Sequence, residues 1–411
     1  MNEQRLRALL REAPVPEAAE AERRGLMVVG AAYAERESRQ PPRLPRLALA
    51  FAIVTLLAAI LLTPAWAAMR DWIGDVLTAG VRNPEPALTE VPGGGHLLVV
   101  NPQGAWVVQP DGSRRLLGRY REAAWSPHGL YVAAAEGRTL SAIEPGGAAH
   151  WVLSTKGAVS DPRWSPSGVR IAYRAGRSLR VVVGDGTKDS LLARAVAPIP
   201  PVWSPLGLHL LAYIDAGRRL RIVNTDTRER LAAAAVPAGV EELGWAPGGA
   251  LLLVARPRSL QVRSVTTDKL ANRLALGPTR SLPLPSGEIV RQAAFSPRGE
   301  TIAALLERPG RGSRPPRSTL ALIDPSRGTS RTLFAVPGRL AELTWSPDGG
   351  RLLIGWPEAD EWLFIPTRGR ERPRAIAPIS REFAPGAAGA AGFPHVAGWC
   401  CGVQIGSPGA P

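Results

Sequence analysis

Acidic or amide side chains recur along the chain, each three residues before a repeated aromatic residue. They belong to Glu122, Asp161, Glu242, Gln292 and Glu342, with Pro200 and Val396 in the same place in two further copies. Four of these seven positions are acidic, although the net charge of the chain is +15. Carboxylates brought together in space would attract a cationic ligand or partner. Alternatively, each carboxylate accepts hydrogen bonds from the backbone of the turn that enters its strand.

No second set of residues suits catalysis or the binding of a metal or cofactor. The sequence contains no G-x-S-x-G turn, no phosphate loop and no G-x-G-x-x-G after a strand. Its five histidines are spread singly, and its two cysteines, Cys400 and Cys401, are adjacent. Adjacent cysteines rarely meet disulfide geometry, so we expect small turn residues rather than a redox pair. We therefore predict no catalytic residue, no metal site and no cofactor.

The strong positive charge does not by itself indicate nucleic-acid binding. Only three of the 50 basic residues are lysines, a bias that a GC-rich genome produces. The arginines are scattered through turns, without the clustering and interleaved aromatic residues of a groove that follows a phosphate backbone. We expect no nucleic-acid partner.

The aromatic residues head a motif that returns six times, at intervals of 39, 39, 42, 50 and 50 residues. Its first residues are Trp125, Trp164, Trp203, Trp245, Phe295 and Trp345, each followed by Ser-Pro or Ala-Pro and then by Gly two residues on. The aromatic ring would end one strand and pack between neighbouring units. Pro and Gly then form a turn, and a β-rich run follows, so the period indicates a four-stranded propeller blade.

The motif resembles the W-S-P-D-G repeat of the TolB-like, WD-type β-propeller family. The best local match runs from Asp161 to Tyr173 and reads DPRWSPSGVRIAY, and the resemblance covers about residues 94–402. Only Asp348 keeps the family's turn Asp, and Ala246 replaces Ser in the fourth copy. The resemblance implies an all-β propeller of four-stranded antiparallel blades.

The ends of the propeller region, residues 94–403, set the number of blades. Three runs near the start of this region look like strands without a leading one: His96–Val100, Ala105–Gln109 and Arg115–Leu117. The run His395–Gly402, which contains the aromatic Trp399, looks like a leading strand without followers. Joining these termini would close the ring without an exposed sheet edge. We predict seven blades, or six if the C-terminal match is accidental.

Residues 47–69 form an uncharged, apolar stretch that is long enough to cross a bilayer as a helix. Four arginines at positions 36–46 precede it, which predicts an N-terminus inside the cytoplasmic membrane and a propeller outside. A cleaved signal peptide is the alternative, but its n-region would be unusually long. Residues 1–46 would be a short helical cytoplasmic tail, 70–93 a juxtamembrane linker and 404–411 a disordered C-terminus.

These features predict a membrane-anchored, extracytoplasmic binding or sensing propeller without catalytic activity. Its ligand would be a protein or a small molecule. The layout of a helical tail, one span and an outer domain is also that of membrane-bound anti-sigma regulators, so residues 1–46 could bind a sigma factor. Some related propellers gate prolyl-oligopeptidase-type hydrolases, but only residues 346–411 follow the last internal motif aromatic, too few for a hydrolase domain.

Overall fold

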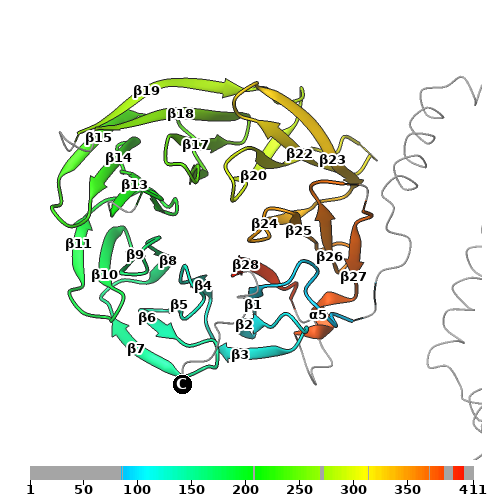
Figure 1. Cartoon of the computed structure of the whole chain (residues 1–411), viewed down its shortest axis with the longest axis horizontal. Coiled ribbons are helices and arrows are strands. Elements are labelled where there is room, and N and C mark those ends of the chain that lie inside the picture. Colours follow the sequence, from blue (N-terminus) through cyan, green and yellow to red (C-terminus); the bar gives the residue numbers. More distant parts are fainter. Residues whose placement is uncertain are drawn as a thin grey trace, which may run out of the picture. The chain divides into compact units, whose positions relative to one another are not determined.

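The computed structural model describes residues 85, 87–206, 209–268, 273–312, 314–369, 371–383 and 392–401. Within them the chain forms seven four-stranded antiparallel sheets, arranged as blades around a central axis (Figure 1). The predicted seven-bladed, all-β propeller is thereby confirmed, and the six-bladed alternative is wrong.

Blades are numbered here in chain order, with strands given from the axis outward. Blade 1 contains β28 (His395–Cys400), β1 (His96–Asn101), β2 (Gly104–Val108) and β3 (Arg114–Gly118). Blade 2 contains β4 (Glu122–Trp125), β5 (Val132–Glu136), β6 (Thr139–Ile143) and β7 (Ala149–Ser154). Blade 3 contains β8 (Val159–Trp164), β9 (Arg170–Ala175), β10 (Ser178–Val183) and β11 (Ser190–Ala193).

The remaining blades follow the same order. Blade 4 contains β12 (Val202–Trp203), β13 (Leu210–Ile214), β14 (Arg219–Asn224) and β15 (Arg230–Ala235). Blade 5 contains β16 (Glu242–Trp245), β17 (Leu251–Arg256), β18 (Ser259–Asp268) and β19 (Arg273–Leu282). Blade 6 contains β20 (Ile289–Phe295), β21 (Ile302–Arg308), β22 (Arg317–Asp324) and β23 (Thr329–Pro337). Blade 7 contains β24 (Ala341–Trp345), β25 (Arg351–Trp356), β26 (Glu361–Pro366) and β27 (Arg374–Ile376), followed by the short helix α5 (Ile379–Glu382).

Strands from the two ends of the propeller region close the ring. β28 pairs antiparallel with β1, from His96 opposite Cys400 to Val100 opposite His395, with an irregularity between Leu98 and Val99. The pairing confirms the predicted closure and leaves no inner strand of blade 1 unpaired. The chain before β1 also packs on the ring, because Glu85 forms a parallel bridge with Ile376 at the end of β27.

The core is divided among the interfaces between blades. Seven clusters of buried apolar side chains occupy the seven interfaces between neighbouring blades of the described residues. Successive side chains of a strand point to opposite faces of its sheet. In β1, Leu97 and Val99 therefore join the cluster shared with blade 7, whereas Leu98 joins the cluster shared with blade 2.

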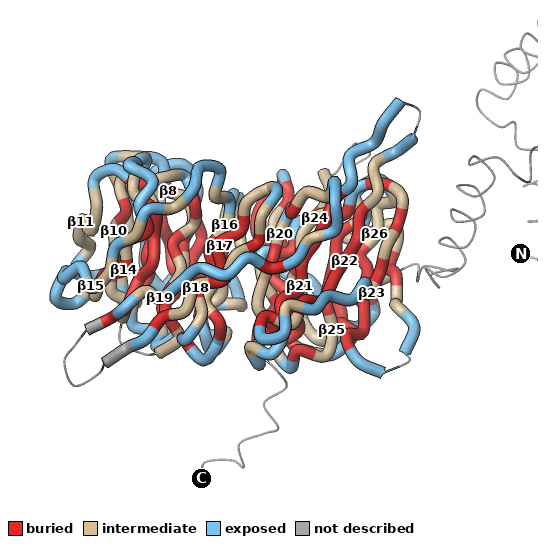
Figure 2. The backbone as a smooth tube through the Cα atoms, turned by 90° about the horizontal axis from the view of Figure 1, so that it is seen from above, coloured by how far each residue is buried: buried red, intermediate tan, exposed pale blue. Residues whose placement is uncertain are grey.

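Two faces of the ring are distinguished below. The strand-start face is the one where inner strands such as β4, β16 and β24 begin, and the motif-turn face is the opposite one, which carries the turns that follow the motif aromatics. Buried residues concentrate along the middle strands, and exposed residues on outer strands such as β19 and on both faces (Figure 2).

Several predictions concern residues outside the described ranges. They include the tail (1–46), the span (47–69), most of the linker and the C-terminus (404–411). In the part of the chain that the structure describes, no helix has the length and apolarity needed to cross a membrane.

The prediction for the two cysteines was wrong. Cys400 and Cys401 are joined by a disulfide. The backbone of Cys401 has a left-handed φ of 56°, so the chain turns at the disulfide. Their sulfur atoms lie over Gly129 of the first motif, where an added Cβ would meet Cys401 Sγ at 2.6 Å. Glycine at this turn is therefore needed both for its φ of 70° and for space.

Candidate functional site

The motif aromatics pack between their own blade and the preceding one. Trp164, Trp203, Trp345 and Trp399 are buried, whereas Trp125, Trp245 and Phe295 are partly buried against the corresponding clusters. Each large ring thus removes apolar area from water at a blade interface, as the sequence predicts.

Three of the indoles also bond to the preceding blade. Trp203 Nε1 donates to Arg163 O at 2.9 Å, Trp245 Nε1 to Val202 O at 3.3 Å and Trp345 Nε1 to Ala294 O at 3.2 Å. In every case the acceptor residue directly precedes the motif aromatic of the neighbouring blade. The repeat therefore sets the offset between blades by a hydrogen bond as well as by packing.

The five predicted site residues all lie near the strand-start end of their inner strands. They do not form a ring of free carboxylates around the axis, because each of them is bonded to another group of the protein. Glu122 Oε2 accepts from Asp161 N at 2.5 Å, Glu242 Oε2 from Ala293 N at 2.9 Å and Gln292 Oε1 from Leu343 N at 2.8 Å. These acceptors cap backbone of the next blade, rather than the turn that enters their own strand.

Asp161 and Glu342 complete the set with different contacts. Asp161 pairs with Arg174 of its own blade at 2.5 Å, and Glu342 binds His395 of β28. Both residues have left-handed φ values, 52° and 49°, at irregularities in strands β8 and β24. The local bulges redirect these two side chains.

Burial changes the protonation of two of the carboxyls. It raises the pKa of Glu122, and it raises the pKa of Glu242 to about 7. The Ala293 amide and the positive charge of Arg163 oppose the rise at Glu242, since both favour the carboxylate. Glu242 is therefore partly protonated near neutral pH.

Gln292 and Glu342 also line a cavity, which makes this the strongest candidate for a binding site. The cavity has a volume of about 540 Å³ and lies on the strand-start face between blades 6 and 7. Its other lining residues are Arg291, Leu305, Glu307, Arg339, Leu340, Ala341, Pro357 and Glu358. A volume of several hundred Å³ is typical of sites for small ligands.

Opposite charges alternate around this strand-start cavity. Buried Glu307 accepts from Arg291 Nε at 2.9 Å and lies 3.6 Å from Arg339 Nε. The hydrogen bond from Arg291 lowers the pKa of Glu307, which keeps the carboxylate charged. Glu358 accepts from the Arg339 amide at 2.9 Å. The rim can therefore offer both guanidinium donors and carboxylate acceptors to a polar ligand.

A second cavity of about 390 Å³ opens on the same face between blades 4 and 5, and is lined mainly by apolar residues such as Pro198, Ile199 and Val240. No three His, Cys, Asp or Glu side chains come together as a set that could hold a metal within the described ranges.

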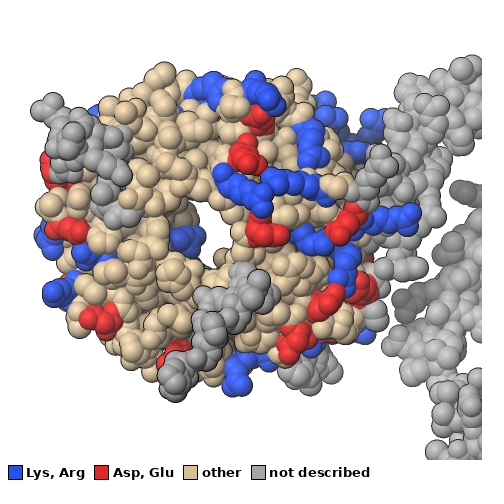
Figure 3. Space-filling model, in the orientation of Figure 1, with Lys and Arg blue, Asp and Glu red and all other residues tan. Residues whose placement is uncertain are grey.

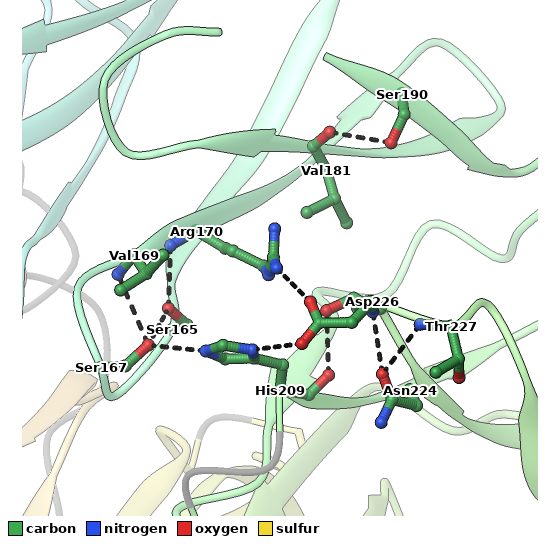
Figure 4. A network of polar contacts seen from close by, with 11 residues as sticks. Ser165, Ser167, Val169, Arg170, Val181, Ser190, His209, Asn224, Asp226 and Thr227 are labelled. Carbon is green, nitrogen blue, oxygen red and sulfur yellow. Dashed lines mark hydrogen bonds and ion pairs between the residues drawn. The ribbon is translucent and has the colours of Figure 1, made fainter. Parts of the chain in front are cut away.

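A Ser–His–Asp network joins blades 3 and 4 on the motif-turn face (Figure 4). His209 Nε2 lies 3.2 Å from Ser167 Oγ, and its Nδ1 lies 2.7 Å from Asp226 Oδ2. This is the order of contacts that activates a catalytic serine. Here Arg170 pairs with the other Asp226 oxygen, and Ser167 Oγ lies 3.0 Å from Ser165 Oγ. These contacts link the turns of adjacent blades.

Sequence reasoning missed this network, because 42 residues separate Ser167 from His209. The one available signal is Ser167 itself, which stands where the resembled family carries Asp in the motif turn.

Comparison with known proteins supports the fold alone. No protein-family model and no curated protein matches the chain. Among solved structures, it is similar to the Cps50 (Swd1) β-propeller domain of Myceliophthora thermophila, with 17% identity, a TM-score of 0.52 and coverage of 68% of this chain and 96% of that one. KlHsv2 with loop 6CD replaced by a Gly-Ser linker is similar at 11% identity, with a TM-score of 0.50 and coverage of 68% and 93%. Hydrazine synthase of Kuenenia stuttgartiensis shares 14% identity over 60% of this chain and 76% of its own, with a TM-score of 0.47.

Proposed function

We propose that this chain is a non-catalytic binding propeller that holds a polar ligand, such as a peptide segment or a small molecule, in the strand-start cavity between blades 6 and 7. The cavity itself carries the proposal: it combines a volume of about 540 Å³ with donors and acceptors on one rim. Ligands of propellers and other rigid scaffolds bind where such convergent polar groups surround a concave surface.

The rigidity of the cavity walls supports the same function. Gln292 bonds both the N–H and the carbonyl oxygen of Leu343, at 2.8 and 3.3 Å, so its side chain is fixed between the blades. Glu307 is held by two arginines. A site whose polar groups are already positioned loses less entropy when a ligand binds.

Photo-crosslinking can test the ligand site. A photoreactive amino acid at exposed Pro357, which lines the cavity rim, should give a discrete crosslinked product in cells of the native host. The same residue at exposed Arg177, in a turn between β9 and β10, is the matched control on the same face. Equal products from both positions, or none from position 357, would exclude this cavity as the binding site.

We also propose that residues 47–69 anchor the propeller on the outer side of the cytoplasmic membrane. The proposal rests on the uncharged stretch and on the arginines that precede it. A Ser330→Cys variant that lacks Cys400 and Cys401 should react with a membrane-impermeant thiol reagent in intact cells. Labelling only after lysis would reverse the orientation, and a soluble product that begins near residue 68 would show a cleaved signal peptide.

The absence of catalysis is part of the proposal and has its own test. Of the described contacts, the Ser167–His209–Asp226 network comes nearest to a nucleophile with its base. Purified full-length protein and a Ser167→Ala variant should hydrolyse short-chain p-nitrophenyl esters at the same background rate. Ester hydrolysis that disappears in the variant would identify a serine hydrolase instead.

A further inference from the structure

A small cavity with three arginines lies at the opposite end of the interface between blades 6 and 7. It has a volume of about 70 Å³ and opens on the motif-turn face. Its lining residues are Ser296, Arg298, Thr301, Leu322, Arg331, Trp345, Gly349, Thr367 and Arg368. No carboxylate is among them, so every charged side chain that lines the cavity is an arginine.

The three guanidinium groups are neutralised only in part. Arg331 donates to the backbone carbonyl of Thr367 at 2.7 Å, which fixes the side chain without cancelling its charge. Arg368 pairs with Glu300 at 2.9 Å, but both side chains are more than 60% exposed. Surface pairs of this kind are weak. Arg298 makes no ion pair with any described residue.

Other arginines of the propeller are held differently. Arg174, Arg180 and Arg221 each pair with an aspartate at 2.7 Å or less, and all three are largely shielded from solvent. In those places a carboxylate of the same blade satisfies the guanidinium. The arginine cavity differs from those three places because no aspartate or glutamate pairs with Arg298 or Arg331 among the described residues.

The floor of the cavity adds a hydroxyl donor. Ser296 is buried, and its Oγ accepts from Thr301 N at 3.3 Å, while its hydroxyl hydrogen is donated to no acceptor of the described residues. Thr367 is also buried, but its single hydroxyl hydrogen is shared between the carbonyl oxygens of Gly349 and Gly350, at 2.9 and 3.1 Å. Blue side chains lie over blades 6 and 7 on this face, with red ones among them (Figure 3).

We propose that this arginine cavity binds the phosphate or sulfate group of a small soluble ligand. The volume exceeds the space that one water occupies and suits a single tetrahedral oxyanion, with the rest of the ligand in solvent. Planar guanidinium groups match the oxygen spacing of such anions and bind them by charge-assisted hydrogen bonds. This inference does not depend on the strand-start cavity, which lies on the other face.

Calorimetric titration of the full-length protein in detergent micelles tests the site, with inorganic phosphate and inorganic sulfate as probes. Sodium chloride keeps the ionic strength constant, and acetate serves as the comparison anion. We expect saturable binding of phosphate or sulfate and none of acetate. Arg298→Gln and Arg331→Gln should each weaken it about tenfold, the effect of losing one charge-assisted hydrogen bond.

Arg177→Gln is the matched control, because Arg177 is an exposed arginine in a turn of another blade. It should bind like the wild type. Since Arg298 has no ion pair to lose, Arg298→Gln should unfold at the wild-type temperature, which separates lost binding from lost folding. No saturable binding to the wild type, equal binding of acetate, or equal weakening by Arg177→Gln would each overturn the proposal.

Discussion

The two ends of the interface between blades 6 and 7 carry similar numbers of arginines but use them in opposite ways. At the strand-start end, Arg291 and Arg339 surround buried Glu307. At the motif-turn end, Arg331 meets a backbone carbonyl, and Arg298 meets no carboxylate of the described residues. The first end is balanced internally, whereas the second keeps net positive charge.

We infer from this difference that the pairing of charges, rather than their number, decides which end suits a single anion and which suits a polar ligand with groups of both charges. The high arginine content of the chain therefore says little by itself about binding partners. What matters is whether a carboxylate of the neighbouring strand lies within reach of each guanidinium.

The largest expected effect comes from the aromatic residue that packs in the core of this interface. Trp345 is buried in the cluster between blades 6 and 7 and bonds to Ala294 of blade 6. Trp345→Ala should lower the free energy of unfolding by about 3–5 kcal/mol, because it leaves a cavity in a packed core. Chemical denaturation measures the change, and Val152→Ala, at a side chain 61% exposed, is the control with little effect. A loss below about 1 kcal/mol would mean that this ring does not hold the two blades together.

Removing the buried carboxylate at the strand-start end should have the next largest effect on the free energy of unfolding. Glu307→Gln should cost about 2 kcal/mol at neutral pH, because a charged acceptor for two arginines is lost. The folded-state pKa of Glu307 is lowered by Arg291, so its stabilisation is present above the pKa of an ordinary Glu and is lost as the pH falls through the lowered value. Unfolding curves of the variant and wild type should therefore converge in acid. A constant difference at every pH would rule out the carboxylate charge as the cause.

The neighbouring interface allows a substitution in the stabilising direction. Glu242 caps Ala293 of the next blade, as Gln292 caps Leu343, but its folded-state pKa is raised to about 7. Its contribution is full below the pKa of an ordinary Glu and falls as the pH rises through about 7. Glu242→Gln should thus stabilise the protein at pH above 7 by about 1–2 kcal/mol. This is a part of the roughly 3 kcal/mol that a pKa rise from 4.5 to about 7 represents at about 1.36 kcal/mol per pKa unit. If thermal unfolding shows the same gain in acid, titration of Glu242 is not the reason.

The smallest effect on stability is expected at the motif-turn end of the interface. Arg298→Gln should change the free energy of unfolding by less than about 0.5 kcal/mol, as is usual for exposed positions without a partner. Set against Glu307→Gln in the same denaturation assay, it contrasts a structural charge with an available one. A cost similar to that of Glu307→Gln would remove the distinction between the two ends.

The architecture of the propeller followed from the sequence. The W-S-P-x-G turns depend on local chemistry, since Pro and Gly select the backbone conformation within a few residues. Their spacing gave the blade length, and the unmatched strand around Trp399 gave the closure onto His96–Val100, as the pairing of β28 with β1 confirms. The packing of the motif aromatics between blades was predictable for the same reason.

Only the tertiary structure decided which polar groups meet. Glu122 and Asp161 are 39 residues apart, Gln292 and Leu343 are 51 apart, and Ser167 and His209 are 42 apart. Such contacts depend on the offset and rotation between neighbouring blades, which shift a side chain by more than the length of a hydrogen bond while leaving the repeat pattern unchanged. The arginine cavity has the same origin, because the turns bearing Arg298 and Arg368 belong to different blades. The sequence repeat determined that blades pack side by side. The geometry of that packing determined which charged side chains form ion pairs, as Glu307 does, and which form none among the described residues, such as Arg298.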